Sequence, residues 1–312
     1  MPEPKVSIII GTFNRAHFIL ESLKSVFQQT FKDWECLIID DGSSDNTKQI
    51  VSSYIIDDKR FNYLERPDSY KKGLPGARNY GLDNAKGDYI IFFDDDDYAH
   101  PEVISVCINL LLSNPDYDFC HFNKSSFTNE PPEMLYVKKK NIQYYPIGMK
   151  QIEEVISNKI PMASCTVLWR ENCFANIRFN ESLEYAEEWE CYSRILLAGY
   201  SGIGINEFLY YNRKHADSNT GEFWRGGAKR KESQINAIIL VMEQLKIKGY
   251  LTKTLFRYFI QMGIFLKDIS IIKYLFKVAN ISLFVKFKYY LLFYFYPIIG
   301  RMYRLKKYLT NG

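Results

Sequence analysis

The chain has 312 residues, 47% of them hydrophobic, which is enough for one large domain with a substantial core and an appendage. Its net charge of +4 is unevenly distributed: segment 251–312 holds eleven lysines and arginines against one acid, about +10, which leaves about −6 for the rest. Six cysteines without C-x-x-C spacing and an N-terminus without a basic, apolar leader argue against a zinc site, a disulfide framework and a signal peptide, and favour buried thiols in a reducing cytoplasm.

Strands and helices alternate over roughly the first 95 residues. Short β-branched and apolar runs predict the strands, and apolar residues at helical spacing predict the helices between them. The predicted strands are 6–10, 35–39, 61–64 and 89–93, and the predicted helices are 17–29, one beginning at 45–47, and 77–84. This alternation indicates an α/β fold with a mainly parallel sheet flanked by helices, in which ligands bind at the carboxyl ends of the strands.

The pattern becomes less regular after Pro101. Helices are predicted at 102–113 and 184–198, and strands at 117–122, 163–169 and 203–211. An irregular stretch containing Pro131 and Pro132 separates the first two of these strands, and a loop at 212–227 closes the unit. We therefore expect the body of the protein to end near residue 225.

The last sixty residues or so interleave aromatic and aliphatic side chains with lysine and arginine, as in 286–290. The longest uncharged run, 289–300, has 12 residues and a proline, so it is too short to span a bilayer. Basic amphipathic helices with aromatic faces typically lie in the membrane interface. We expect 226–312 to be a helical region that contacts an anionic membrane surface; the alternative is packing on the body or on a second subunit. No nucleic-acid partner is expected, since the aliphatic content is too high for a solvated groove.

Four consecutive aspartates, Asp94 to Asp97, directly follow the predicted strand 89–93. Like charges at a strand end repel one another unless a cation neutralises them, and hard oxygen ligands suit Mg²⁺ or Mn²⁺, which clamps phosphate oxygens. In this arrangement Asp94 and Asp96 can bind the ion, while Asp95 and Asp97 orient the loop or a sugar hydroxyl. The alternative is a solvated acidic loop.

A second acidic pair, Asp40 and Asp41, follows the predicted strand 35–39 and favours a binding site over a solvated loop. The chain lacks a G-x-x-x-x-G-K-[ST] or G-x-G-x-x-G loop after any predicted strand. This argues against P-loop and dinucleotide-dependent enzymes, so that phosphate must be held in another way.

Four motifs of the first 100 residues together carry a resemblance to a known family. They are Val6-Ser7-Ile8-Ile9-Ile10-Gly11-Thr12-Phe13-Asn14-Arg15, Ile39-Asp40-Asp41-Gly42-Ser43-Ser44-Asp45, Gly76-Ala77-Arg78-Asn79-Tyr80-Gly81 and Phe93-Asp94-Asp95-Asp96-Asp97. In this order and spacing they resemble glycosyltransferase family 2, with the Rossmann-like GT-A fold, over roughly residues 4–215. The resemblance implies a GT-A domain at 1–225, with a nucleotide-binding half at 1–100 and an acceptor half at 101–225.

The resemblance also implies an activity and a place in the cell. It implies an inverting, metal-dependent enzyme that moves a hexosyl or N-acetylhexosaminyl group from a nucleotide-diphosphate donor, commonly a UDP-sugar, to an acceptor hydroxyl. A basic aromatic tail would bring such an enzyme to a lipid-linked acceptor in bacterial surface-polysaccharide synthesis. The expected location is cytoplasmic, peripheral on the inner face of the cell membrane.

Individual roles follow by position from the same resemblance. Asp41 would accept the base N–H of the nucleotide, and the other residues expected at the nucleotide are Thr12, Asn14, Asp40, Arg78 and Asp95. Asp94 and Asp96 would bind Mn²⁺ or Mg²⁺, with His215 at the metal or the leaving diphosphate. Glu188 would be the catalytic base and Glu187 its alternative, where the family more often has Glu-Asp.

Two other functions compete with this interpretation. A nucleotidyltransferase would normally carry a glycine-rich N-terminal loop with arginine and lysine, which 11–15 does not resemble. A non-catalytic protein that binds a nucleotide-sugar would have lost the base, and the pair Glu187-Glu188 argues against that.

Overall fold

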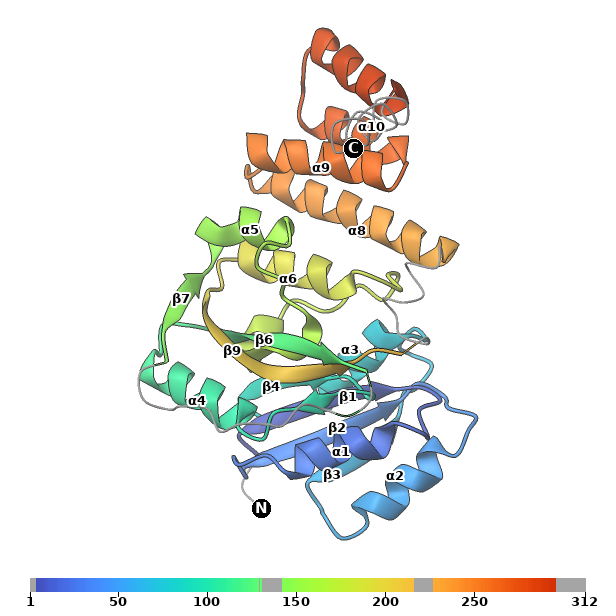
Figure 1. Ribbon diagram of the computed structural model, residues 1–312, viewed down its shortest axis with the longest axis vertical. Coiled ribbons are helices and arrows are strands. Elements are labelled where there is room, and N and C mark those ends of the chain that lie inside the picture. Colours follow the sequence, from blue (N-terminus) through green and yellow to red (C-terminus); the bar gives the residue numbers. More distant parts are fainter. Residues whose placement is uncertain (1–3, 129, 131–141, 216–226, 296–312) are drawn as a thin grey trace, which may run out of the picture. The chain divides into compact units, whose positions relative to one another are not determined.

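Figure 1 shows the computed structural model, which describes residues 4–128, 130, 142–215 and 227–295. The chain divides into two compact units, Met1–Ala237 and Ile238–Gly312. The division falls inside helix α8 (Ala228–Ile247), whereas the boundary expected between 225 and 226 lies outside the described residues.

One mixed sheet forms the centre of the first unit. Its strands are β1 (Val6–Thr12), β2 (Trp34–Asp40), β3 (Phe61–Glu65), β4 (Tyr89–Phe93), β5 (Tyr98–Ala99), β6 (Phe119–Phe127), β7 (Tyr144–Ile147), β8 (Val167–Arg170) and β9 (Gly202–Arg213). They lie in the order β3-β2-β1-β4-β8-β6-β9-β5, and β7 pairs with β9. Strands β3, β2, β1 and β4 are parallel, whereas β8 is antiparallel to both of its neighbours. The predicted α/β class with a mainly parallel N-terminal sheet is therefore confirmed.

Helices cover both faces of the parallel strands (Figure 1). They are α1 (Ile19–Phe27), α2 (Thr47–Ile55), α3 (Leu74–Asn84) and α4 (Val103–Ser113), followed by α5 (Ile152–Ile156) and α6 (Glu187–Leu197). The apolar sides of α1 and α4 share one core with Ile8, Ile38 and Ile91. Helix α3 packs on the opposite face, where a Cβ at Gly81 would lie 2.5 Å from a methyl carbon of Ile9. This close packing requires glycine and brings the start of α3 to the carboxyl edge of the sheet.

Most predicted elements agree with the structure to within about three residues, but the stretch 163–169 does not form one strand. Residues Ser164–Thr166 form a short 3₁₀ helix, because the Ala163 carbonyl accepts bonds from both the amide and the hydroxyl of Thr166, at 3.0 and 2.9 Å. Strand β8 begins only at Val167. Helix α6 begins at Glu187, three residues later than predicted, since Ala186 adopts a left-handed φ of 63°.

The sequence analysis does not predict several short elements of the described chain. They include β5, β7, α5 and the 3₁₀ helices Met149–Gln151 and Glu171–Phe174. Strand β7 contains Pro146, which suits a strand that, within the described chain, pairs only with β9. The irregular stretch around Pro131 and Pro132 and most of the loop expected at 212–227 lie outside the described residues.

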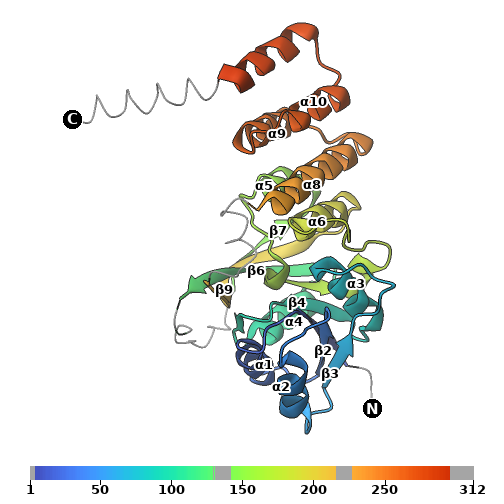
Figure 2. The same cartoon turned by 90° about the vertical axis from the view of Figure 1, so that its right-hand side faces the viewer.

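The second unit is helical as far as it is described, up to residue 295. It contains the end of α8, then α9 (Lys253–Phe265), α10 (Ile269–Val278) and helical residues 283–295, which follow α10 in Figure 2. Side chains cap both named helices: Thr252 Oγ1 accepts from the Leu255 amide at 3.2 Å, and Asp268 Oδ1 accepts from the Ser270 amide at 2.8 Å. Among the described residues, each helix is too short or too polar to cross a bilayer.

Candidate active site

The acidic motifs gather at the carboxyl edge of the parallel strands. Thr12, the last residue of β1, is paired in register with Asp40, the last residue of β2, and Asp94 to Asp97 follow the neighbouring strand β4. The loop after β1 contacts both acidic segments. Its Asn14 Oδ1 accepts from the Ser44 amide beyond β2 at 2.8 Å, and its Arg15 Nε lies 3.3 Å from Asp95 Oδ1 beyond β4. One loop therefore holds the two acidic segments next to each other.

Asp41 is buried and held from two sides. Its Oδ1 forms an ion pair with Arg66, and its Oδ2 accepts from the Gly73 amide at 2.9 Å. Its own amide donates to the Thr12 carbonyl at 2.9 Å. Arg66 directly follows β3, so three adjacent strand ends fix this carboxylate. A fixed carboxylate at this position can accept an N–H bond from a nucleobase, because each of its oxygens has a further lone pair.

The other residues expected at the nucleotide build the surrounding loops. Asp40 accepts from the amide and hydroxyl of Ser43, at 3.1 and 2.5 Å, and so closes the turn after β2. Asn14 has a left-handed φ of 55°, which asparagine tolerates better than most residues. Thr12 is buried at the end of β1. Their direct contact with a nucleotide stays a prediction.

Each aspartate of the loop after β4 has a different partner. Asp94 Oδ1 lies 3.5 Å from Arg78, Asp95 faces Arg15, and Asp96 Oδ2 lies 2.8 Å from His215 Nε2. Asp97 Oδ1 accepts from the amide of Arg213 in β9 at 2.7 Å. Asp96 and His215 are thus in contact although they are far apart in the sequence.

The acidic loop carries more negative charge than the buried site favours. Burial, followed by the charge of Asp96, raises the pKa of Asp95 to about 7, and burial likewise raises the pKa values of Asp94 and Asp97. A divalent cation would relieve this cost. Asp94 and Asp96 remain 32% and 15% exposed, so their hard oxygens are accessible to an ion. The donor set therefore fits Mn²⁺ or Mg²⁺.

A second group of possible ligand atoms overlaps this site. Oxygen atoms of Asp94 and Asp97 and the Sγ of Cys165 lie within 4.8 Å of one another. Burial raises the pKa of the Cys165 thiol well above its usual value, so it offers a neutral thiol there. Because Mn²⁺ and Mg²⁺ prefer oxygen, the carboxylates at Asp94 and Asp96 suit these ions better than the thiol does.

Arg78 joins the acidic loop to the second half of the sheet. This buried guanidinium contacts Glu187 Oε1 at 2.9 Å, Ser164 Oγ at 2.8 Å and Asp94 at 3.5 Å. Burial and then the charge of Glu188 raise the pKa of Glu187 to about 8, while Arg78 opposes this shift. The 2.9 Å contact with Arg78 occupies Glu187 Oε1 at the start of α6, on the buried side of the helix.

Glu188 lies differently from its neighbour. It is half-buried and lines a cavity of about 150 Å³ together with Trp189, Tyr192 and Met162. Trp189 Nε1 donates to the Ile156 carbonyl at 3.2 Å, which fixes the indole ring at the cavity. A carboxylate that opens onto a small cavity beside aromatic rings can accept a proton from a bound hydroxyl group.

Sequence reasoning assigned no role to several residues at the site. Arg15 stands in a quoted motif, and Arg66 ends up at the sheet edge because it follows a strand. Lys124 of β6 has no such signal: its Nζ lies 3.9 Å from Cys165 Sγ, which itself lies within 4.8 Å of carboxylate oxygens of Asp94 and Asp97. Only the pairing of β6 with β8 and β9 brings Lys124 to the acids.

A family model and named relatives all match this chain to glycosyltransferases. The model of glycosyl transferase family 2 matches residues 7–171. A Campylobacter jejuni protein named GalNAc(5)-diNAcBac-PP-undecaprenol beta-1,3-glucosyltransferase is 33% identical over 57% of this chain and 55% of its own length. The Escherichia coli protein WfgD, named UDP-Glc:alpha-D-GlcNAc-diphosphoundecaprenol beta-1,3-glucosyltransferase, is 35% identical over 46% of this chain and 55% of its own length. The chain therefore spans about half the length of these relatives.

Solved structures share the fold at lower sequence identity. TarS of S. aureus in complex with UDP-GlcNAc gives a TM-score of 0.66 at 19% identity, covering 85% of this chain and 74% of that one. The mannosyltransferase PcManGT of Pyrobaculum calidifontis, in complex with GDP-Man and Mn²⁺, gives 0.57 at 15% identity, covering 90% and 77%. The first unit thus has the GT-A fold. With the family model matching more than half of its residues, this chain belongs to glycosyl transferase family 2.

Proposed function

We propose that the protein transfers a sugar, with inversion, from a UDP-sugar to a hydroxyl group of a lipid-linked glycan. The observation that carries this proposal is the carboxyl edge of the sheet, where Asp41 follows β2 and the acidic loop follows β4. Arg78 joins this loop, at Asp94, to Glu187, the neighbour of Glu188 in α6. Two relatives are named for transfer to undecaprenyl diphosphate-linked sugars, and TarS is known in complex with UDP-GlcNAc, which supports the donor and acceptor classes. The sugar would be a hexosyl or N-acetylhexosaminyl group.

The first half of the sheet would hold the donor. Asp41, oriented by Arg66 and Gly73, would accept the N–H of uracil. Asp94 and Asp96, with His215, would hold Mn²⁺ or Mg²⁺, which when bound neutralises the oxygens of the leaving diphosphate. Arg15 and Arg78 add positive charge at the same edge, and Arg78 keeps Asp94 in place.

The second half of the sheet would bind the acceptor and provide the catalytic base. A hydroxyl group placed in the cavity beside Trp189 would lose its proton to Glu188 as its oxygen forms a bond to the anomeric carbon. The bond from that carbon to the diphosphate oxygen breaks at the same time, and the nucleoside diphosphate leaves from the opposite face. One displacement of this kind inverts the anomeric centre. Glu187 would position Arg78 and leave the proton transfer to its neighbour.

A transfer assay tests the proposal. With Mn²⁺ and a lipid-diphosphate-linked sugar as acceptor, radiolabel from a UDP-hexose or UDP-N-acetylhexosamine should enter the lipid fraction, and excess EDTA should remove most of this activity until metal is restored. The α-linked donor should give a β-linked product by NMR. Binding of UDP-sugars without any turnover or donor hydrolysis would instead support a non-catalytic binding protein.

We further propose that the second unit holds the enzyme on the cytoplasmic face of the membrane. Helix 283–295 exposes Leu283, Phe284 and Phe287 to the extent of 82%, 80% and 61%, and Leu291, Tyr294 and Phe295 are also exposed on it. Six residues spaced in this way lie along one side of a helix. With thirteen lysines and arginines against two acids in 238–312, this side would enter the interface of an anionic bilayer.

Replacing Phe284 and Phe287 with glutamate should lower binding to anionic vesicles by at least about tenfold. Each change removes aromatic area that the bilayer would bury and adds a negative charge that anionic lipids repel. Vesicle co-sedimentation measures the partition coefficient. Ile56→Glu is the matched control, since Ile56 is 77% exposed in the first unit and should bind as the wild type does. Equal loss in the control, or no loss in the double variant, would contradict the role of this helix.

A further inference from the structure

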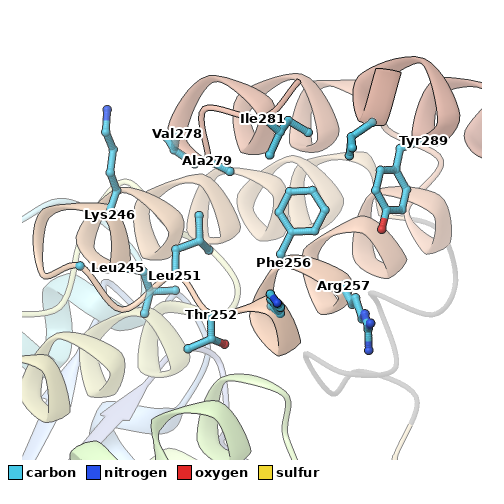
Figure 3. Close-up of a pocket in the computed structure, with 13 residues that line it drawn as sticks. Leu245, Lys246, Leu251, Thr252, Phe256, Arg257, Val278, Ala279, Ile281 and Tyr289 are labelled. Atoms are coloured by element: carbon cyan, nitrogen blue, oxygen red, sulfur yellow. The ribbon is translucent and has the colours of Figure 1, made fainter. Parts of the chain in front are cut away.

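The second unit contains a cavity of its own. It has a volume of about 540 Å³ and lies between the end of α8, the start of α9, the end of α10 and helix 283–295 (Figure 3). Its centre is apolar: Phe256 and Ile281 face each other across it, with Leu251 nearby. Such a volume is in the range of small-molecule sites.

The rim of this cavity is basic. Lys246, Lys253 and Arg257 belong to its lining and are exposed, and Figure 3 shows the side chains of Lys246 and Arg257 extending away from the apolar centre. Helix α9 begins at Lys253, so the positive end of its dipole also faces this rim. The residues that line the cavity include no acid. An apolar interior with a cationic rim suits an amphiphile that has an anionic head group.

Helix 283–295 connects the cavity with the proposed membrane surface. Val285 and Tyr289 line the cavity and are half-buried, whereas Phe284 and Phe287 of the same helix are exposed. The cavity therefore lies behind a helix whose other side presents aromatic residues to its surroundings. If this helix lies in the membrane interface, the cavity is next to the head groups and upper acyl chains of the lipids around it.

We propose that this cavity binds one anionic phospholipid of the membrane, with an acyl chain along Phe256 and Ile281 and its phosphate at Lys246, Lys253 and Arg257. Charge complementarity favours this occupant over a second copy of the chain, since 238–312 carries thirteen basic residues and two copies would repel each other. The site goes beyond the proposed transfer reaction and rests only on the proposed membrane location. The lipid site would make membrane binding selective for anionic lipids, whereas an apolar helix alone would discriminate only weakly between anionic and neutral lipids.

Short-chain phospholipids below their micelle concentration test the cavity apart from the bilayer. Titration of the full chain with dihexanoyl phosphatidylglycerol, followed by calorimetry, should give one site per chain, and dihexanoyl phosphatidylcholine should bind at least about tenfold more weakly. The triple variant Lys246→Ala, Lys253→Ala, Arg257→Ala should lose about a hundredfold in affinity for phosphatidylglycerol, at roughly a factor of five per charge.

The matched control removes three other exposed lysines of the same unit, in the variant Lys248→Ala, Lys273→Ala, Lys277→Ala. These lysines lie outside the cavity lining, so the affinity should fall no more than about threefold. If both triple variants lose affinity equally, or if the two lipids bind equally well, general charge attraction accounts for the binding and the site is refuted.

Filling the cavity gives a second test. Ala279→Trp places a large ring into the lining and should abolish the calorimetric signal while leaving helix content unchanged; Val285→Trp serves if Ala279→Trp does not fold. Unchanged binding in a folded filled variant would overturn the proposal. Sugar transfer to a water-soluble acceptor should be unaffected in these variants, so failure here is distinguishable from failure of the transferase proposal.

Discussion

Replacing Asp96 with alanine should lower kcat/KM for sugar transfer by at least about a thousandfold, because the ion at the diphosphate would lose a ligand worth several kcal/mol at the transition state. The Asp96 carboxylate contacts the His215 imidazole at 2.8 Å and lies 3.9 Å from the Arg15 guanidinium, so its loss also leaves both side chains without this partner. Calorimetry with UDP should show that the increase in affinity produced by Mn²⁺ has disappeared. Initial rates over a range of donor concentrations provide the kinetic measurement.

A stability measurement separates this effect from misfolding. Asp96 is among the charges that raise the pKa values of Asp94, Asp95 and Asp97, so its removal relieves repulsion and the metal-free variant should melt no lower than the wild type. Asp83→Ala is the control: Asp83 pairs with Arg178 at the surface, at 2.8 Å, and its loss should change activity less than twofold. An Asp96→Ala enzyme with full metal-dependent activity would remove the ion from its proposed place.

The sequence predicts the carboxyl edge of the sheet well, for a physical reason. Strands β1, β2 and β4 are buried on both faces, so they appear as continuous apolar runs whose ends are marked by the first polar residues. Parallel neighbours bring those ends to one edge, and this is why Asp40, Asp41 and the acidic loop were expected together. A local pattern and one topological rule suffice here.

The partners of these acids depend on contacts that no local pattern contains. Arg66 meets Asp41 because β3 lies next to β2, and Arg78 meets Glu187 across 109 positions of sequence. Lys124 and Cys165 reach the acidic loop only because β8 and β6 continue the sheet beyond β4, with β8 antiparallel to both β4 and β6. Side-chain choice at such long-range contacts has no periodicity, so it cannot be inferred from spacing in one sequence.

In the second unit, too, some features can be predicted from the sequence and others cannot. Its basic and aromatic composition predicts helices and suggests a membrane contact, because both follow from residue type. The cavity does not follow from composition: it exists because α8, α9, α10 and helix 283–295 leave their apolar side chains Leu251, Phe256 and Ile281 incompletely packed. Interior voids depend on how side chains from different helices fit together, and only coordinates contain that information.

Changing Glu188 to glutamine should lower kcat by about a thousandfold, within the range of general-base effects, while the KM for the donor stays nearly constant. Glutamine keeps the size of the side chain at the cavity beside Trp189, so acceptor binding should survive. Initial rates over a range of donor concentrations, at saturating acceptor, measure both constants.

Glu187→Gln is the matched neighbour, and the two variants should fail in different ways. Its loss leaves the buried Arg78 without its 2.9 Å carboxylate partner, which costs about 3–5 kcal/mol of folding free energy and should appear as a lower melting temperature. Its activity should also fall, because a displaced Arg78 no longer holds Asp94 in place and the affinity for the metal decreases. A higher Mn²⁺ concentration should therefore restore part of the activity. In Glu188→Gln, the melting temperature should stay at the wild-type value, and added Mn²⁺ should not restore activity. If Glu187→Gln instead abolishes turnover at unchanged stability while Glu188→Gln remains active, Glu187 is the base and Arg78 serves to lower its pKa.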